Sequence, residues 1–209
     1  DAAFANVGNH TQAGYVIAFA HESLNNGQMV QWNPAVWKSF RLARAVSSTL
    51  AAESQAMSIA SGTVEWLMLI IAELLDGPFS VRQACAVLKR RSPILVTDCK
   101  SLCDHLASPS SPTAVEDRRT SIDITIIRES IRNASMHVRW VPTDRMLADS
   151  LTKDAGDPVD LLRSCMRSSS YQISPESEVL DRQAMEKQRR LGKTLQFSDV
   201  GADSPQLQK

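Results

Sequence analysis

The sequence lacks the features that mark secreted, membrane-bound or strongly basic proteins. Its four cysteines form no CxxC pair and no zinc-type ligand set, so we expect reduced thiols and an intracellular protein, cytoplasmic or nuclear. We find no signal peptide and no apolar run of membrane-spanning length, which predicts a soluble chain with no membrane partner. Lysine plus arginine equals aspartate plus glutamate at 23 each, so the basic excess of an autonomous nucleic-acid binder is missing.

What is present suffices for one globular domain with a tail. The 209 residues are 43% hydrophobic, which is near the average for folded proteins and excludes wholesale disorder. The sequence opens without Met inside an apparent strand, Asp1 to Ala5, so we interpret it as a fragment of a longer polypeptide. After about residue 167 the composition turns polar, which predicts a solvated tail.

Local patterns predict an α/β fold, a mixed β-sheet flanked by α-helices. Strand formers at 14–20 and 29–32 enclose Asn26-Gly27, a tight-hairpin signal, and with residues 1–7 they predict three antiparallel strands. Apolar residues spaced by three and four predict a helix from about 47 to 75. The apolar run 93–98 suits a strand covered on both faces. Other expected elements are helices at 80–90, 100–107, 122–133 and 144–153, a loop at 108–112, and a last strand at 136–141.

Four carboxylates occupy positions that a purely structural role explains poorly. Glu53 shares the apolar face of its predicted helix, where an unpaired charge would cost several kcal/mol. Asp98 closes an apolar strand at its carboxyl end, the usual ligand position in sheets with parallel strands. Asp1 lies on the first strand, and Asp149 lies in a helix directly after the last strand. Any one of them alone is better explained as a cap or turn residue, but four at strand–helix junctions indicate a site.

If these four acids converge, their repulsion requires a neutralising cation. Ligand sets made only of oxygen suit Mg²⁺ or Mn²⁺ and do not suit zinc. Two such ions about 4 Å apart can activate a water and stabilise the departing oxygen of a phosphodiester. The expected cofactor is therefore Mg²⁺ or Mn²⁺, two ions.

Ordered motifs across residues 1–155 carry a family resemblance. The most specific is the ending Leu147-Ala148-Asp149-Ser150-Leu151-Thr152-Lys153. The weaker motifs are Asp1-Ala2, Ala13-Gly14-Tyr15-Val16, Trp37-Lys38-Ser39, Ser48-Thr49-Leu50-Ala51-Ala52-Glu53, Val96-Thr97-Asp98, Ile122-Asp123 with Ile127-Arg128-Glu129, and Val141-Pro142-Thr143. In this order they resemble the ribonuclease H domain of copia-type retrotransposon polyproteins. Two positions depart from that pattern: Cys99 replaces the usual Asn, and Thr120-Ser121 replaces Lys-His.

The resemblance implies a ribonuclease H-like domain at 1–155, and for 156–209 the polar composition predicts a helical extension and a polar, disordered tail. It implies a two-metal endonuclease that hydrolyses the RNA strand of RNA–DNA hybrids, with Asp1, Glu53, Asp98 and Asp149 as catalytic and metal-binding residues. Its partners would be the hybrid and the reverse transcriptase and integrase domains of a parent polyprotein.

Two alternatives stay open from the sequence. One is the same fold without catalysis, as a retroelement remnant or a tethering module; retention of all four acids favours the enzyme, and the terminal place of Asp1 favours the remnant. The other is an unrelated resolvase or integrase core, from which the ending at residues 147–153 points away.

Overall fold

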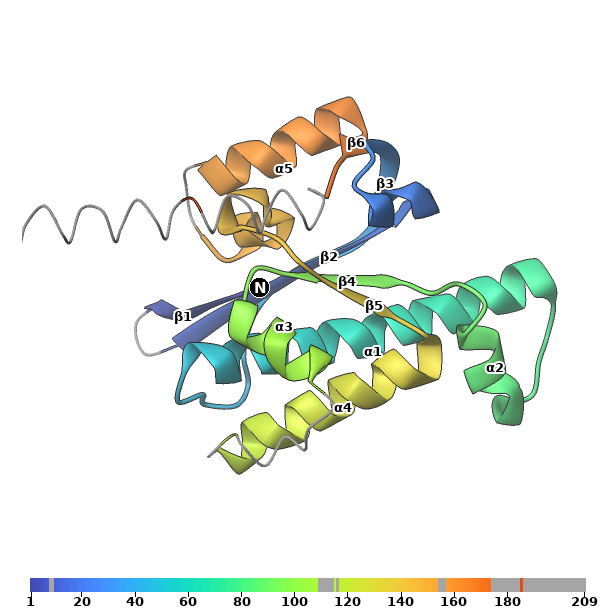
Figure 1. Cartoon of the computed structure of the whole chain (residues 1–209), viewed down its shortest axis with the longest axis horizontal. Coiled ribbons are helices and arrows are strands. Elements are labelled where there is room, and N and C mark those ends of the chain that lie inside the picture. Colours follow the sequence, from blue (N-terminus) through green and yellow to red (C-terminus); the bar gives the residue numbers. More distant parts are fainter. Residues whose placement is uncertain (8–9, 109–114, 116, 154–156, 174–184, 186–209) are drawn as a thin grey trace, which may run out of the picture. The chain divides into compact units, whose positions relative to one another are not determined.

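Three antiparallel strands open the chain, as expected. The computed structural model describes residues 1–7, 10–108, 115, 117–153, 157–173 and 185. Strand β1 (Ala2–Val7) pairs with β2 (His10–Ala20), which pairs with the twelve-residue β3 (Val30–Arg41) (Figure 1). The long β2–β3 ladder is rich in the β-branched and aromatic residues that favour a pleated, half-buried surface.

The link between β2 and β3 is not the tight hairpin that Asn26-Gly27 predicts. A 3-10 helix, η1 (Glu22–Asn26), joins the strands, and the His21 imidazole accepts the Ser23 N–H at its start. Gly27 has φ of 78° and ends this short helix. The hairpin prediction was wrong because the left-handed conformation of Gly27 serves as a helix cap here.

A 28-residue helix, α1 (Thr49–Asp76), follows β3. Ser48 caps its start by accepting the Ala51 N–H at 3.1 Å, and Gly77, with φ of 88°, follows its end. Among the described residues α1 alone is long and apolar enough, by length and composition, to cross a membrane. By length and composition this helix contradicts the expectation that no such run exists, and 17% of its most apolar 18-residue window is buried.

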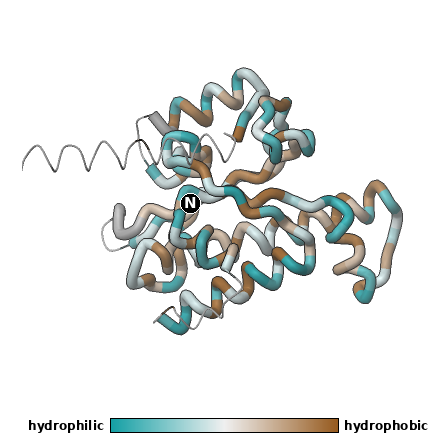
Figure 2. Tube along the Cα trace, in the orientation of Figure 1, coloured by the Kyte–Doolittle hydropathy of each residue, from teal (hydrophilic) through white to brown (hydrophobic). Residues whose placement is uncertain are grey.

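A parallel pair forms a second, separate sheet. Strand β4 (Ile94–Thr97) pairs in parallel with β5 (His137–Trp140), with Ile94 opposite His137. Four further helices lie between α1 and β5 in the sequence: η2 (Val81–Gln83), α2 (Ala84–Leu88), α3 (Lys100–Ala107) and α4 (Arg118–Ala134). Helices α1 and α4 pack together around a core that includes Met57, Leu102 and Ile127. Along these helices hydrophobic and hydrophilic residues alternate, as expected for elements with one buried face (Figure 2).

The predicted helix 144–153 is instead two 3-10 segments, η4 (Thr143–Arg145) and η5 (Leu147–Leu151). They are separated at Met146, whose extended backbone (φ −83°, ψ 105°) interrupts helical hydrogen bonding, so the prediction of one helix was wrong. Helix α5 (Asp157–Ser168) and strand β6 (Ser170–Tyr171) follow, and β6 pairs with the start of β3.

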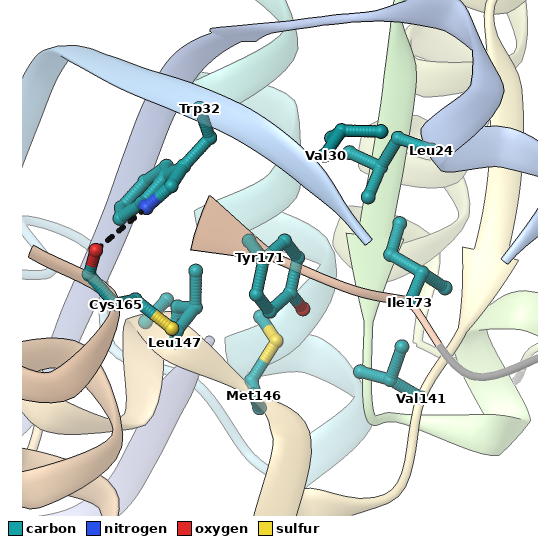
Figure 3. Packing of buried hydrophobic residues seen from close by; sticks show 10 residues of the cluster. Leu24, Val30, Trp32, Val141, Met146, Leu147, Cys165, Tyr171 and Ile173 are labelled. Carbon is teal, nitrogen blue, oxygen red and sulfur yellow. Dashed lines mark hydrogen bonds between the residues drawn. The ribbon is translucent and has the colours of Figure 1, made fainter. Parts of the chain in front are cut away.

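Residues within 157–173 belong to the same core as the strands. The Trp32 indole donates to the Cys165 carbonyl at 3.0 Å, and Tyr171 and Ile173 are buried in the same hydrophobic cluster as Leu147 (Figure 3). The compact unit therefore runs from Asp1 to Ile173, past the boundary expected at 155. Residues 174–209 form a second unit, and the expected polar tail there, like most of the loop at 108–112, lies outside the described residues.

The architecture is thus mixed α/β. The described strands form a four-stranded antiparallel sheet in the order β1-β2-β3-β6 and the separate pair β4-β5, whereas we expected one mixed sheet.

Candidate functional site

Three of the four predicted acids meet at one point. Asp1 precedes β1, Asp98 follows β4, and Asp149 lies in η5. One carboxylate oxygen from each lies within 4.8 Å of the others. The strands bring them there because Asp1 is held to β2 by the Gly14 N–H at 3.0 Å, while Asp98 stands at the carboxyl end of its own strand.

Glu53 adjoins this cluster from the second turn of α1. Its Oε1 accepts the Ala2 N–H at 3.0 Å, and its Oε2 lies 3.9 Å from the Asp1 amino group. The side chain is buried, as its place on the apolar helix face predicts. Glu53 is not one of the three acids within 4.8 Å, but it shares their electrostatic environment.

The charges around Glu53 act in both directions on its proton affinity. Burial raises the pKa of Glu53 above its usual range, and the carboxylates of Asp98 and Asp149 raise it further. The amino group of Asp1 and the Ala2 N–H oppose this rise. Glu53 therefore experiences the mutual repulsion that the sequence argument expects of convergent acids.

Asp149 has an unsatisfied oxygen inside the protein. The residue is 0% exposed, and Oδ2 accepts a hydrogen bond from the Lys153 ammonium. Its Oδ1 is buried and has no hydrogen-bond partner among the described residues. An unpaired acceptor in the interior costs free energy, and a bound cation would remove this cost. The unpaired oxygen of Asp149 is therefore available as a metal ligand beside the carboxylates of Asp1 and Asp98.

Two residues that sequence reasoning did not assign also shape the site. The Thr152 hydroxyl donates to the Asp1 carboxylate, which joins η5 to the first strand. Gly14 permits this contact, because a Cβ there would lie 2.6 Å from the Leu151 Cβ and 3.3 Å from the Thr152 Cγ2. A glycine inside an apolar strand pattern is the available signal for such a close approach.

The donor set suits a hard divalent cation. Asp1, Asp98 and Asp149 offer only carboxylate oxygens, the ligand type that Mg²⁺ and Mn²⁺ prefer. Cys99 lies next to Asp98, but burial raises the pKa of its thiol, so at neutral pH it does not supply a thiolate. The residues present therefore fit the metal expected from the sequence.

The chain matches no protein-family model, no curated protein and no solved structure in the comparisons made.

Proposed function

We propose that this chain is a metal-dependent endonuclease of the ribonuclease H type, which hydrolyses the RNA strand of RNA–DNA hybrids during retrotransposon reverse transcription. The observation that carries the proposal is the meeting of Asp1, Asp98 and Asp149, with Glu53 beside them, from four separate segments of chain. The order of the family-like motifs supports the choice of reaction among those that such a carboxylate site can perform.

Asp1, Glu53, Asp98 and Asp149 would hold two Mg²⁺ or Mn²⁺ ions. When bound, such ions activate a water and stabilise the departing oxygen of a phosphodiester. The chain's own residues prepare the ligands: Thr152 orients the Asp1 carboxylate, and Lys153 orients that of Asp149. The Lys153 side chain is 40% exposed, so its charge remains accessible to a phosphate group from solvent.

The proposed substrate would be recognised mainly by shape, 2′-hydroxyl groups and phosphates, with little reading of base sequence. With this kind of recognition the chain needs no large basic surface of its own, provided that a neighbouring reverse transcriptase domain holds the hybrid. The net charge of zero agrees with a substrate that is held by another domain. An integrase domain is a further proposed neighbour.

The alternative is the same fold without catalysis, as a remnant or a tethering module. One contact favours it: Lys153 already places a positive charge on Asp149, so the acids are partly neutralised by the chain itself. The two proposals differ in whether the site takes up a divalent cation.

A cleavage assay separates them. The folded chain is incubated with a labelled RNA–DNA hybrid and Mg²⁺ or Mn²⁺, and we expect cuts in the RNA strand alone. Asp98→Asn and Glu53→Gln should each reduce the rate by about a hundredfold or more, because each removes a metal ligand. Asp104→Asn is the matched control, since this exposed aspartate on α3 pairs with Lys100 and is not one of the acids that meet. Absence of both cleavage and cation binding in a folded chain would decide for the non-catalytic alternative.

A further inference from the structure

Asp98 differs from the other acids of the site in how its carboxylate is held. The carboxylates of Asp1, Glu53 and Asp149 each accept a hydrogen bond, from a hydroxyl, a backbone N–H and an ammonium respectively. Among the described residues no group donates to the carboxylate of Asp98, which is half-buried. The direction of this side chain therefore depends on how the backbone at Asp98 is held.

The backbone is tied to neighbouring groups on both sides of Asp98. Before it, the Thr97 carbonyl accepts the Val141 N–H at 2.9 Å. After it, the peptide group between Asp98 and Cys99 is bound at both ends. Its carbonyl accepts the Trp140 indole N–H at 2.8 Å, and its N–H donates to the Thr97 hydroxyl at 3.1 Å. Because a peptide group is planar, these bonds restrain φ and ψ of Asp98 and with them the direction of its Cα–Cβ bond.

The bond from Trp140 joins two elements that are distant in the sequence. Trp140 ends β5, where it lies opposite Thr97 in the parallel pair with β4 (Figure 1). Its side chain is half-buried, and the Lys100 ammonium lies 5.9 Å from the ring centroid. The indole thus contacts both the turn that carries Asp98 and the first residue of α3.

We propose that Trp140 is a positioning residue for the carboxylate cluster. Its indole N–H, acting through the Asp98 carbonyl, holds the Asp98 carboxylate beside those of Asp1 and Asp149, so that the cluster binds a divalent cation more tightly. Groups that orient metal ligands typically contribute about 10–100-fold to metal affinity. This inference rests on the proposed function, because it concerns the same metal site.

Trp32 provides a matched comparison for this role. Its indole also donates to a backbone carbonyl, that of Cys165, at 3.0 Å. Cys165 belongs to a hydrophobic cluster and not to the acids that meet. Phenylalanine in place of either tryptophan removes one indole donor and keeps an aromatic ring. Only Trp140→Phe, however, releases the backbone at a carboxylate of the site.

The test measures binding of Mn²⁺ alone to the folded chain, with electron paramagnetic resonance detection of the free ion. We expect the dissociation constant for Mn²⁺ to rise about tenfold in Trp140→Phe and to stay unchanged in Trp32→Phe. Thr97→Val, which removes the hydroxyl that accepts the Cys99 N–H, should weaken Mn²⁺ binding in the same direction. This second variant provides the test if circular dichroism shows that Trp140→Phe does not fold.

Cleavage of a labelled RNA–DNA hybrid gives an independent readout. In Trp140→Phe the rate should fall at limiting Mn²⁺ and return toward that of the parent at saturating Mn²⁺. The KM for the hybrid should not change, because the indole acts on a metal ligand and not on the substrate.

The outcomes separate this inference from the proposed function. If the parent binds Mn²⁺ and both Trp140→Phe and Thr97→Val bind it equally well, the inference fails while the metal site stands. If Trp32→Phe weakens binding as much as Trp140→Phe does, the effect reflects general stability, and the inference fails again. If the folded parent binds no Mn²⁺, the proposed function fails and the inference fails with it.

Discussion

The Lys153 ammonium donates to the Asp149 carboxylate four residues earlier, while the other oxygen of Asp149 lies buried without a hydrogen-bond partner in the described chain. The pair is asymmetric, since Asp149 is fully buried and Lys153 is 40% exposed. In the absence of a divalent cation, Lys153 is thus the positive charge nearest to this carboxylate among the ion pairs of the described residues.

Replacing this lysine should make the protein more dependent on divalent cations. We expect Lys153→Met to lower the free energy of unfolding by about 1–2 kcal/mol, because a buried carboxylate loses the charged partner that the described residues give it, while solvent screens part of the loss. Added Mg²⁺ should raise the Tm of this variant more than that of the parent, since binding to the folded state alone is stabilising.

The matched control for that experiment is Lys89→Met, at the exposed end of α2. It should change neither the free energy of unfolding nor the Mg²⁺-induced shift in Tm. If both lysine variants respond alike in differential scanning fluorimetry, the Asp149–Lys153 pair has no special relation to the cation.

A second prediction concerns the close approach of η5 to β2. Gly14→Ala should lower the free energy of unfolding by about 1–3 kcal/mol, because its Cβ would meet the Leu151 Cβ at 2.6 Å. Urea denaturation would measure the change. Gly62→Ala is the control of opposite sign, since nothing lies within 4 Å of its Cβ position on α1 and alanine stabilises a helix by about 0.5–1 kcal/mol. Destabilisation by both substitutions would contradict the packing argument.

The carboxylates were predictable because their positions follow from local pattern and burial. Glu53 falls on the apolar face of a helix with a clear period and a Ser48 cap, and Asp98 ends an apolar strand; both local structures form as expected. The meeting of these acids depends on tertiary structure, which the sequence argument could state only as a condition.

The features that sequence reasoning missed depend on distant contacts. Nothing local shows that Ser170–Tyr171 will pair with β3, or that the predicted helix 144–153 will break at Met146 to pack Leu147 and Ala148 against the Trp32 cluster. Trp37 on β3 is 57% exposed, although it lies in one of the family-like motifs, and its exposure also depends on tertiary structure. The hydrogen bond from the Thr152 hydroxyl to the Asp1 carboxylate likewise depends on the packing of η5 against the start of β1.

A third prediction tests the core that joins the C-terminal segment to the sheet. Trp32→Phe keeps an aromatic ring beside Tyr171 but removes the donor to the Cys165 carbonyl. We expect a loss of about 1–3 kcal/mol in the free energy of unfolding, since a buried acceptor loses its partner. Trp66→Phe, at a site on α1 that is 64% exposed, should change it by less than about 0.5 kcal/mol. Equal effects in thermal denaturation would exclude a structural role for the indole N–H.

The last prediction concerns the ion pair between Arg44 and Asp123, whose side chains are 36% and 7% exposed. Burial raises the pKa of Asp123 above its usual range, and the hydrogen bond and charge of Arg44 oppose that rise. Arg44→Met should therefore raise this pKa further. Because the folded state then holds the proton more tightly than the unfolded state, the free energy of unfolding should fall as pH rises from the usual aspartate range to the new folded value.

The expected loss in Arg44→Met is about 1–2 kcal/mol at pH 7, less than for a fully buried pair because Arg44 is partly solvated, and it should nearly vanish near pH 4. Urea denaturation across this pH range measures it. In the double variant Arg44→Met with Asp123→Asn, no carboxylate remains to titrate, so the added pH dependence should disappear. A loss of equal size at every pH, or one that persists in the double variant, would mean that Arg44 stabilises the protein through packing of its aliphatic stem and not through its charge.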